Sequence, residues 1–198
     1  MIPAKRGSMF QVNADDKKAM HIFDKKLSEI NSYPLIAQDI STLQVNVGYK
    51  CNPVCTHCHV DASPDRTEEM SEVTVERIID ILDRHDRITT LDITGVSPEY
   101  NPHYRRLVKT AADLGKNVIV RTNLAIWCEP GMEDIPGFLA ENRAGIVASL
   151  PCYTAEGVDG QRGRGTYDIA MSALKTLNRL GYGRQGTGLV LDLACRNR

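Results

Sequence analysis

The chain has 198 residues, of which 42% are hydrophobic and 25% charged, with a net charge of −1 at pH 7. This balance predicts one soluble globular domain with a sizeable core. The near-neutral charge gives no reason to expect nucleic acid or an anionic membrane as a partner. No stretch has the roughly 18 apolar residues that a membrane-spanning helix needs.

Residues 1–40 are a polar lead-in with one predicted helix. Apolar residues recur there at helical spacing, at Met20, Phe23, Leu27 and Ile30. Pro34 should end this helix. The segment contains no apolar run of the secretory type, so we expect a cytoplasmic protein.

Predicted strands and helices alternate through residues 41–198, which we expect to form the main domain. Short apolar runs predict five strands, at residues 43–49, 90–94, 117–121, 146–150 and 188–193. Apolar positions at helical spacing predict helices around residues 75–82, 104–111, 132–142 and 170–177, and residues 157–165 form a glycine-rich loop. This alternation indicates an α/β fold with a parallel sheet, whose functional residues gather where the strands end.

Three cysteines follow the first predicted strand with the spacing Cys-x3-Cys-x2-Cys, at Cys51, Cys55 and Cys58. Thiolate is a soft ligand, and three thiolates on one loop suit an iron–sulfur cluster or a zinc ion. A zinc site would use His57 or His59 as its fourth ligand, although His59 is the direct neighbour of Cys58. A plain electron-carrying cluster has four cysteine ligands, so a cluster with three keeps one iron open to a small molecule.

The cysteine spacing is that of the radical S-adenosylmethionine (SAM) enzymes, and longer phrases resemble the arsenosugar-biosynthesis branch of that superfamily. These phrases span roughly residues 40–193 and comprise Leu43–Gly48, Cys51–Ala62, Val118–Leu124, Glu129–Gly131 and Ala148–Tyr153. The resemblance implies a partial (β/α)6 barrel, of which about five strand–helix units are present. We expect the sixth strand and the C-terminal domain of the branch to be missing, and the shortened chain to be a poor catalyst alone.

The resemblance also implies the cofactors and the reaction. Cys51, Cys55 and Cys58 would bind a [4Fe–4S] cluster, and its open iron would bind SAM. Enzymes of the branch cleave SAM reductively and transfer the 5′-deoxyadenosyl group to a methylated trivalent arsenical, with electrons from a flavodoxin or ferredoxin type donor. Two alternatives stay open: a radical SAM enzyme with another small-molecule or peptide substrate, and a non-catalytic zinc or iron–sulfur protein.

Further candidate SAM contacts come from the same resemblance. The family places an aromatic ring near the adenine where this chain has His57. Its Gly-Gly-x-Pro-Glu segment, which holds the methionine amino group, corresponds to Gly95–Glu99, so the candidates are Gly95, Pro98 and Glu99. Val96 replaces the second glycine and fits poorly if the position needs positive φ. The alternative is an ordinary turn with Glu99 in solvent.

Four residues near the ends of the third and fourth strands complete the candidates. Arg121 offers a fork that suits the SAM carboxylate, with a salt bridge as its alternative, and Asn123 lies at the same rim. Ser149 lies where related enzymes contact the ribose, with a bond to the backbone as its alternative. Cys152 is a possible soft ligand for arsenic, although free cysteines are often simply buried. The basic stretch Gln161–Gly165 could contact an anionic group, although we expect it to be solvated.

Overall fold

The computed structural model describes residues 21–36, 39–56 and 58–195. The chain divides into two compact units, Met1–Gln38 and Asp39–Arg198. The described part of the first unit contains the predicted helix, α1 (Ile22–Glu29), which has no buried residue. Met20, which was assigned to this helix, lies outside the described residues.

The second unit is built on a five-stranded sheet in the order β1-β2-β3-β4-β5, and every neighbouring pair is parallel. The strands are β1 (Thr42–Asn46), β2 (Thr90–Thr94), β3 (Asn117–Thr122), β4 (Gly145–Ser149) and β5 (Leu191–Ala194). All five predicted strands are therefore present, although the first ends earlier and the last begins later than the apolar runs suggest. The predicted α/β fold and partial barrel are confirmed.

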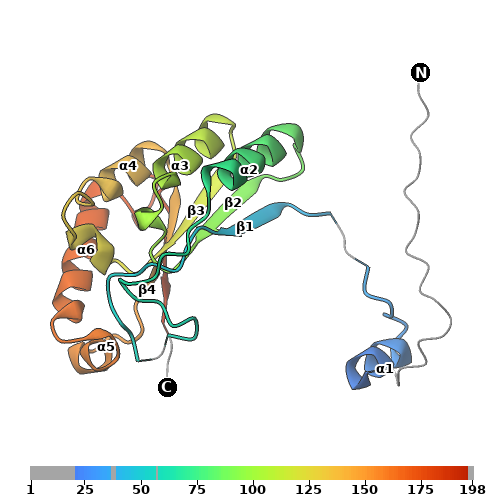
Figure 1. Cartoon of the computed structure of the whole chain (residues 1–198), viewed down its shortest axis with the longest axis horizontal. Coiled ribbons are helices and arrows are strands. Elements are labelled where there is room, and N and C mark those ends of the chain that lie inside the picture. The colour runs from blue at the N-terminus through green and yellow to red at the C-terminus, as the bar shows by residue number, and fades with distance from the viewer. Residues whose placement is uncertain (1–20, 37–38, 57, 196–198) are drawn as a thin grey trace. The chain divides into compact units, whose positions relative to one another are not determined.

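Helices α2, α3, α4 and α6 lie along one face of this sheet (Figure 1). The helices and turns of the unit are α2 (Glu72–Arg84), η1 (Pro98–Tyr100), α3 (Tyr104–Asp113), η2 (Ala125–Cys128), α4 (Ile135–Glu141), α5 (Ala155–Arg162) and α6 (Thr166–Leu180). No helix in the described ranges is both long and apolar enough to cross a membrane.

The prediction of a glycine-rich loop at residues 157–165 was wrong, because most of this stretch is helix α5. Thr154 caps the helix by accepting a hydrogen bond from the Gly157 N–H at 3.2 Å. The loop is confined to the residues after Arg162, where Gly163 and Gly165 have φ values of 102° and 84°.

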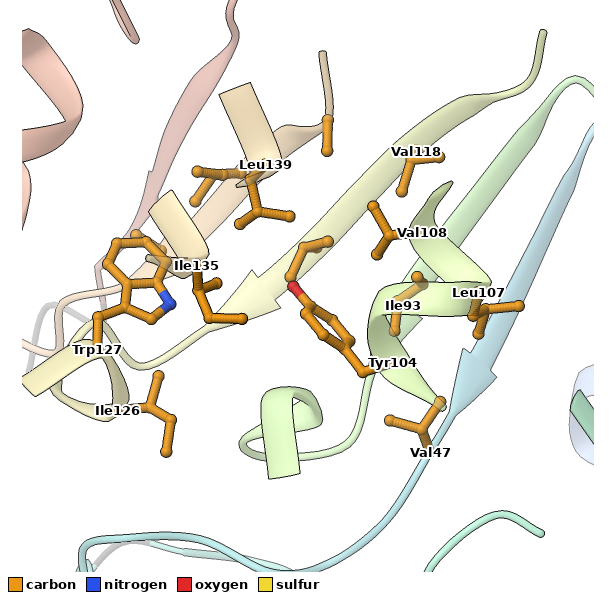
Figure 2. Packing of buried hydrophobic residues seen from close by; sticks show 14 of the residues in the cluster. Val47, Ile93, Tyr104, Leu107, Val108, Val118, Ile126, Trp127, Ile135 and Leu139 are labelled. Carbon is orange, nitrogen blue, oxygen red and sulfur yellow. The ribbon is translucent and has the colours of Figure 1, made fainter. Parts of the chain in front are cut away.

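The core lies between the sheet and its helices, as Figure 2 shows for part of the cluster. Strand residues such as Ile93 and Val120 meet helix residues such as Leu107 and Leu139, and all four are completely buried. This packing fixes the five strands side by side, so their carboxyl ends and the loops that follow meet at one rim.

Candidate functional site

A cavity of about 480 Å³ opens at the rim where the strands end. Each strand contributes at least one residue to its wall, including Asn46, Thr94, Arg121, Val147 and Ala194. The cysteine loop closes another side with Cys51, Cys55 and Cys58. A cavity of this size suits a small molecule or cofactor.

One backbone hydrogen bond closes the base of the cysteine loop, and another joins the middle of the loop to α5. The Cys51 N–H donates to the Ser63 carbonyl at 3.1 Å, and the Thr56 N–H donates to the Gln161 carbonyl of α5 at 3.1 Å. A side-chain contact adds to these, because Arg66 donates to the Asp61 carbonyl at 2.9 Å. These bonds hold the loop at its first cysteine, between its second and third cysteines, and after its third.

All three cysteines carry free thiols, with Cys51 buried and the other two half-buried. Burial raises the pKa of Cys51 and of Cys55 above the usual thiol value. A cluster of iron ions fits this donor set, because metal coordination deprotonates thiols that are otherwise neutral. Among the described residues, no group of three or more His, Cys, Asp or Glu side chains is arranged to hold one metal ion. In a [4Fe–4S] cluster each thiolate binds a different iron, so the sulfurs need not converge on one point.

Of the two histidines in the loop, the structure describes His59 alone. His59 is exposed and lies at the cavity wall. His57 lies outside the described residues, so its roles beside adenine or as a zinc ligand stay predictions.

The turn after β2 reaches the cavity through its backbone. A Cβ atom at Gly95 would lie 2.9 Å from the backbone nitrogens of Val47 and Gly48, so only glycine fits this close approach. Val96 follows at φ 63° and lines the cavity, which means that the position does adopt the left-handed region. Pro98 is buried at the start of η1. Gly95 and Pro98 thus shape the turn, and Val96 is the residue of this turn that lines the cavity.

Glu99 occupies neither of the two places that the sequence suggested. It is 5% exposed, so it is not in solvent, and it is not among the residues of the cavity wall. Its Oε1 accepts a hydrogen bond from Trp127 Nε1 at 3.2 Å, whereas Oε2 has no hydrogen-bond partner among the described residues. Burial raises the pKa of Glu99 to about 7. Glu99 has this buried position because η1 turns its side chain inward, beneath the rim.

Arg121 lines the cavity but already has a carboxylate partner. Its Nε and Nη2 atoms donate to Asp92 at 2.9 and 2.8 Å, and Gln44 donates to the same carboxylate at 2.8 Å. The salt-bridge alternative is therefore the observed arrangement, with a partner on β2 rather than on a helix. This pairing leaves less of the guanidinium fork for a second carboxylate.

Arg162, from the basic stretch that was expected to be solvated, instead lies at the cavity wall. Its guanidinium donates to the Ser149 carbonyl at 2.7 Å and to Ser149 Oγ at 2.6 Å, and its buried Nε has no hydrogen-bond partner within the described part of the chain. None of the ion pairs among the described residues includes it. Burial lowers its pKa, and the nearby charges of Cys55 and Cys51 act in the opposite direction. The cap at Thr154 was the only sequence signal for a helix that buries this residue.

Ser149 and Asn123 lie beside Arg162 at the same cavity wall. Ser149 Oγ donates to the Thr122 carbonyl at 3.3 Å, so the predicted alternative of a backbone bond is present. Asn123 turns toward the cysteine loop, with Nδ2 2.8 Å from Asn52 Oδ1. Both side chains border the space in which SAM is expected to bind.

Cys152 lies away from this group. It is not among the residues of the cavity wall, because its sulfur turns back over the start of α5, 3.4 Å from Thr154 Oγ1. A Cβ atom at Gly157 would lie 2.5 Å from this sulfur, so the glycine makes room for it. The hydrogen bond from Thr154 lowers the pKa of Cys152.

Comparison with known proteins gives the family. The family model of the radical SAM superfamily matches residues 45–192. Mycofactocin maturase MftC of Mycobacterium tuberculosis is 31% identical over 134 residues, which are 68% of this chain and 33% of the relative. The subtilosin biosynthesis protein AlbA of Bacillus subtilis is 25% identical and covers 67% of this chain and 29% of its own length. The chain thus spans about a third of the length of these relatives.

Solved structures agree on the fold. The structure of Streptococcus suis SuiB bound to S-adenosylmethionine has a TM-score of 0.62 and 16% identity, covering 88% of this chain and 44% of SuiB. The structure of anSMEcpe with bound AdoMet has a TM-score of 0.61 and 16% identity, covering 78% of this chain and 43% of anSMEcpe. The cofactors predicted from the sequence, a [4Fe–4S] cluster and SAM, are those of the family that the family model identifies. With three cysteines at the required spacing on one cavity wall, the chain belongs to the radical SAM superfamily of enzymes.

Proposed function

We propose that this enzyme transfers the 5′-deoxyadenosyl group of SAM to a methylated trivalent arsenical, as in arsenosugar synthesis. The observation that carries the proposal is the phrase Ala148–Tyr153, which resembles the arsenosugar branch and lies at the rim of the cavity. It supplies Ser149 to the cavity wall and, three residues later, the thiol of Cys152 over the start of α5, outside that wall. A half-buried thiol with a lowered pKa suits a thiophilic arsenic centre.

When bound, the cluster would supply an electron to SAM and thereby the reactive adenosyl carbon. The chain's own residues would hold and orient the cofactors. Cys51, Cys55 and Cys58 would ligate three irons. Arg162 is the cation without a carboxylate partner at this wall, and its guanidinium with the Ser149 hydroxyl would hold the SAM carboxylate. We propose Arg162 for this role in place of Arg121, which Asp92 already engages.

The turn after β2 would bind the methionine end of SAM through its backbone. Gly95 permits the close approach to Val47 and Gly48, just after β1, and Val96 continues the turn at positive φ at the cavity wall. The electron would come from a low-potential donor of the flavodoxin or ferredoxin type. We place the enzyme in the cytoplasm, where thiols such as these stay reduced.

A peptide substrate is the second candidate, and the relatives favour it. A mycofactocin maturase and a subtilosin biosynthesis protein are among the similar proteins, and one solved structure is of SuiB bound to precursor peptide SuiA. On this alternative the same residues bind the same cofactors, and the substrate contacts differ.

The experiment is anaerobic incubation of the cluster-loaded chain with SAM, a strong reductant and dimethylated trivalent arsenic, followed by mass analysis. Because the shortened chain is expected to be a poor catalyst, we expect a small yield of adenosylated arsenical beside 5′-deoxyadenosine, and neither product from the Cys51→Ala variant. Formation of 5′-deoxyadenosine with no arsenic-containing product would overturn the arsenical assignment while leaving radical SAM chemistry in place. Cys128→Ala, at the exposed end of η2, is the matched control for loss of one thiol.

A further inference from the structure

Cys51 differs from the other two cysteines of the loop in its surroundings. It is 3% exposed, and two polar side chains from other elements contact its sulfur. Ser97 Oγ lies 3.4 Å from Cys51 Sγ, and Asn123 Nδ2 lies 3.5 Å from it. Ser97 and Asn123 are themselves 2% and 5% exposed, so water cannot substitute for them at this point.

The amide of Asn123 has a fixed orientation. Its Oδ1 accepts a hydrogen bond from the Ile126 N–H at 3.0 Å, which leaves the NH2 group facing the cysteine loop. The two amide protons have two oxygen acceptors at short distance, Asn52 Oδ1 at 2.8 Å and Ser97 Oγ at 2.9 Å. Asn52 is oriented in turn, because its own NH2 group donates to Glu129 at 3.4 Å.

The direction of the hydrogen bond between Ser97 and Cys51 follows from this count of donors. Ser97 Oγ accepts from Asn123, so its own proton can go to Cys51 Sγ at 3.4 Å or to Asn52 Oδ1 at 3.5 Å. Asn52 Oδ1 already accepts from Asn123, and a charged thiolate is the stronger acceptor of the two. A ligating Cys51 is a thiolate and has no proton to give. The bond between Ser97 and Cys51 therefore runs from hydroxyl to sulfur, and Asn123 polarises the hydroxyl from behind.

We propose that Asn123 and Ser97 are positioning residues that donate a relay of hydrogen bonds onto the Cys51 thiolate and thereby raise the reduction potential of the cluster. The inference rests on the proposed ligation of the cluster by Cys51. Reduction adds negative charge to the cluster, and hydrogen bonds to its sulfurs stabilise that charge. Ser97 belongs to the same turn as Val96, so one turn serves both the SAM cavity and the cluster ligand.

The test is a spectroscopic redox titration of the cluster-loaded chain, without substrate. At a fixed applied potential we expect Ser97→Ala to lower the ratio of reduced to oxidised cluster about fivefold, because the lost hydrogen bond stabilises the reduced cluster more than the oxidised one and only this difference changes the ratio. Resonance Raman spectra in H₂O and D₂O should show an isotope shift of an iron–thiolate band in the wild type that Ser97→Ala abolishes. Thr94→Val is the matched control, because Thr94 lines the same cavity and its removed hydroxyl has no hydrogen bond to a cysteine among the described residues.

A lowered ratio in Ser97→Ala with an unchanged ratio in Thr94→Val supports the relay. An unchanged ratio in Ser97→Ala, or an equal fall in Thr94→Val, overturns it. Absence of about four irons per chain in the wild type would refute the cluster itself, and with it the proposed function. Failure to modify an arsenical, in contrast, would leave the potentials and the relay intact.

Discussion

The helix-covered face of the sheet and its carboxyl-end rim belong to the same five strands but differ in how their residues are satisfied. On the covered face, residues such as Ile93 and Leu107 are apolar and completely buried. At the rim, Val96 and Leu124 adopt positive φ, at 63° and 67°, and Asp61 of the cysteine loop does so at 51°. The rim also buries a carboxyl group at Glu99 with one oxygen unpartnered among the described residues.

Each of these rim features costs free energy that ordinary packing would avoid. Val96 lines the cavity, and Leu124 and Glu99 belong to the turns that follow β3 and β2, so these costs lie in the segments that form the rim and not in the covered face. Substitutions on the two sides of this comparison should therefore have opposite effects. Core substitutions should destabilise the fold, whereas some rim substitutions should stabilise it and impair cofactor binding.

The largest effect is expected from the cysteine loop. Replacing Cys51, Cys55 or Cys58 singly with Ala should abolish the reconstituted cluster, because the cavity wall provides three thiolates and the cluster needs all three. Iron content and visible absorbance after anaerobic reconstitution measure this. The control is Cys128→Ala, which should keep a normal cluster. Normal iron content in all three loop variants would refute the assignment.

Glu99 tests the stability side of the comparison. Its pKa is about 7 in the folded chain, above the ordinary value of 4.5. The folded state holds a proton that the unfolded state loses, so the free energy of unfolding should fall as pH rises from about 4.5 to about 7. A pKa difference of this size corresponds to roughly 3 kcal/mol.

Glu99→Gln should remove this pH dependence. We expect the variant to be more stable than the wild type at pH 8, by up to about 3 kcal/mol, and to differ little at pH 5. Urea unfolding of the cluster-free chain at both pH values measures it, with the exposed Glu141→Gln as control. Equal differences at the two pH values would show that Glu99 is not the titrating group.

Arg162 tests the binding side. Arg162→Gln should weaken SAM binding about thirtyfold, or roughly 2 kcal/mol, because a charged hydrogen bond to the carboxylate is lost. Anaerobic calorimetric titration of the cluster-loaded chain with SAM measures the dissociation constant. Arg164→Gln, on the exposed glycine turn two residues later, should leave it unchanged. If Arg121→Gln weakens SAM binding more than Arg162→Gln does, then Arg121, the residue that the sequence favoured, binds the SAM carboxylate.

The sequence was sufficient for those features that depend on local pattern. Apolar runs gave β2 within its observed bounds, and the spacing of Cys51, Cys55 and Cys58 gave three residues that do meet at one cavity. Both signals come from residues close together in the chain. The glycine at the Val96 position of the related segment suggested that the backbone here needs positive φ, and Val96 does adopt positive φ.

Contacts between distant segments were not predictable in this way. Arg162 was assigned to a solvated loop, yet α5 carries it to Ser149 and the rim. Glu99 was placed in solvent or at the cofactor, yet Trp127, 28 residues later, takes it into the core. Charge patterns alone cannot distinguish a solvated side chain from one that a later element buries.

Val96 provides the smallest and most specific test of strain at the rim. Valine at positive φ is strained by its branched side chain, and glycine at the same φ is not. Because the turn is already formed with valine in place, the strain should appear in stability more than in SAM affinity. We expect Val96→Gly to raise the free energy of unfolding by about 1 kcal/mol, measured by urea unfolding. Val73→Gly, in the right-handed backbone of α2 and 79% exposed, should instead lower it by several tenths of a kcal/mol. If both glycine variants destabilise the chain, the backbone at Val96 carries no strain for glycine to relieve, and the contrast between core and rim would rest on Glu99 and Arg162 alone.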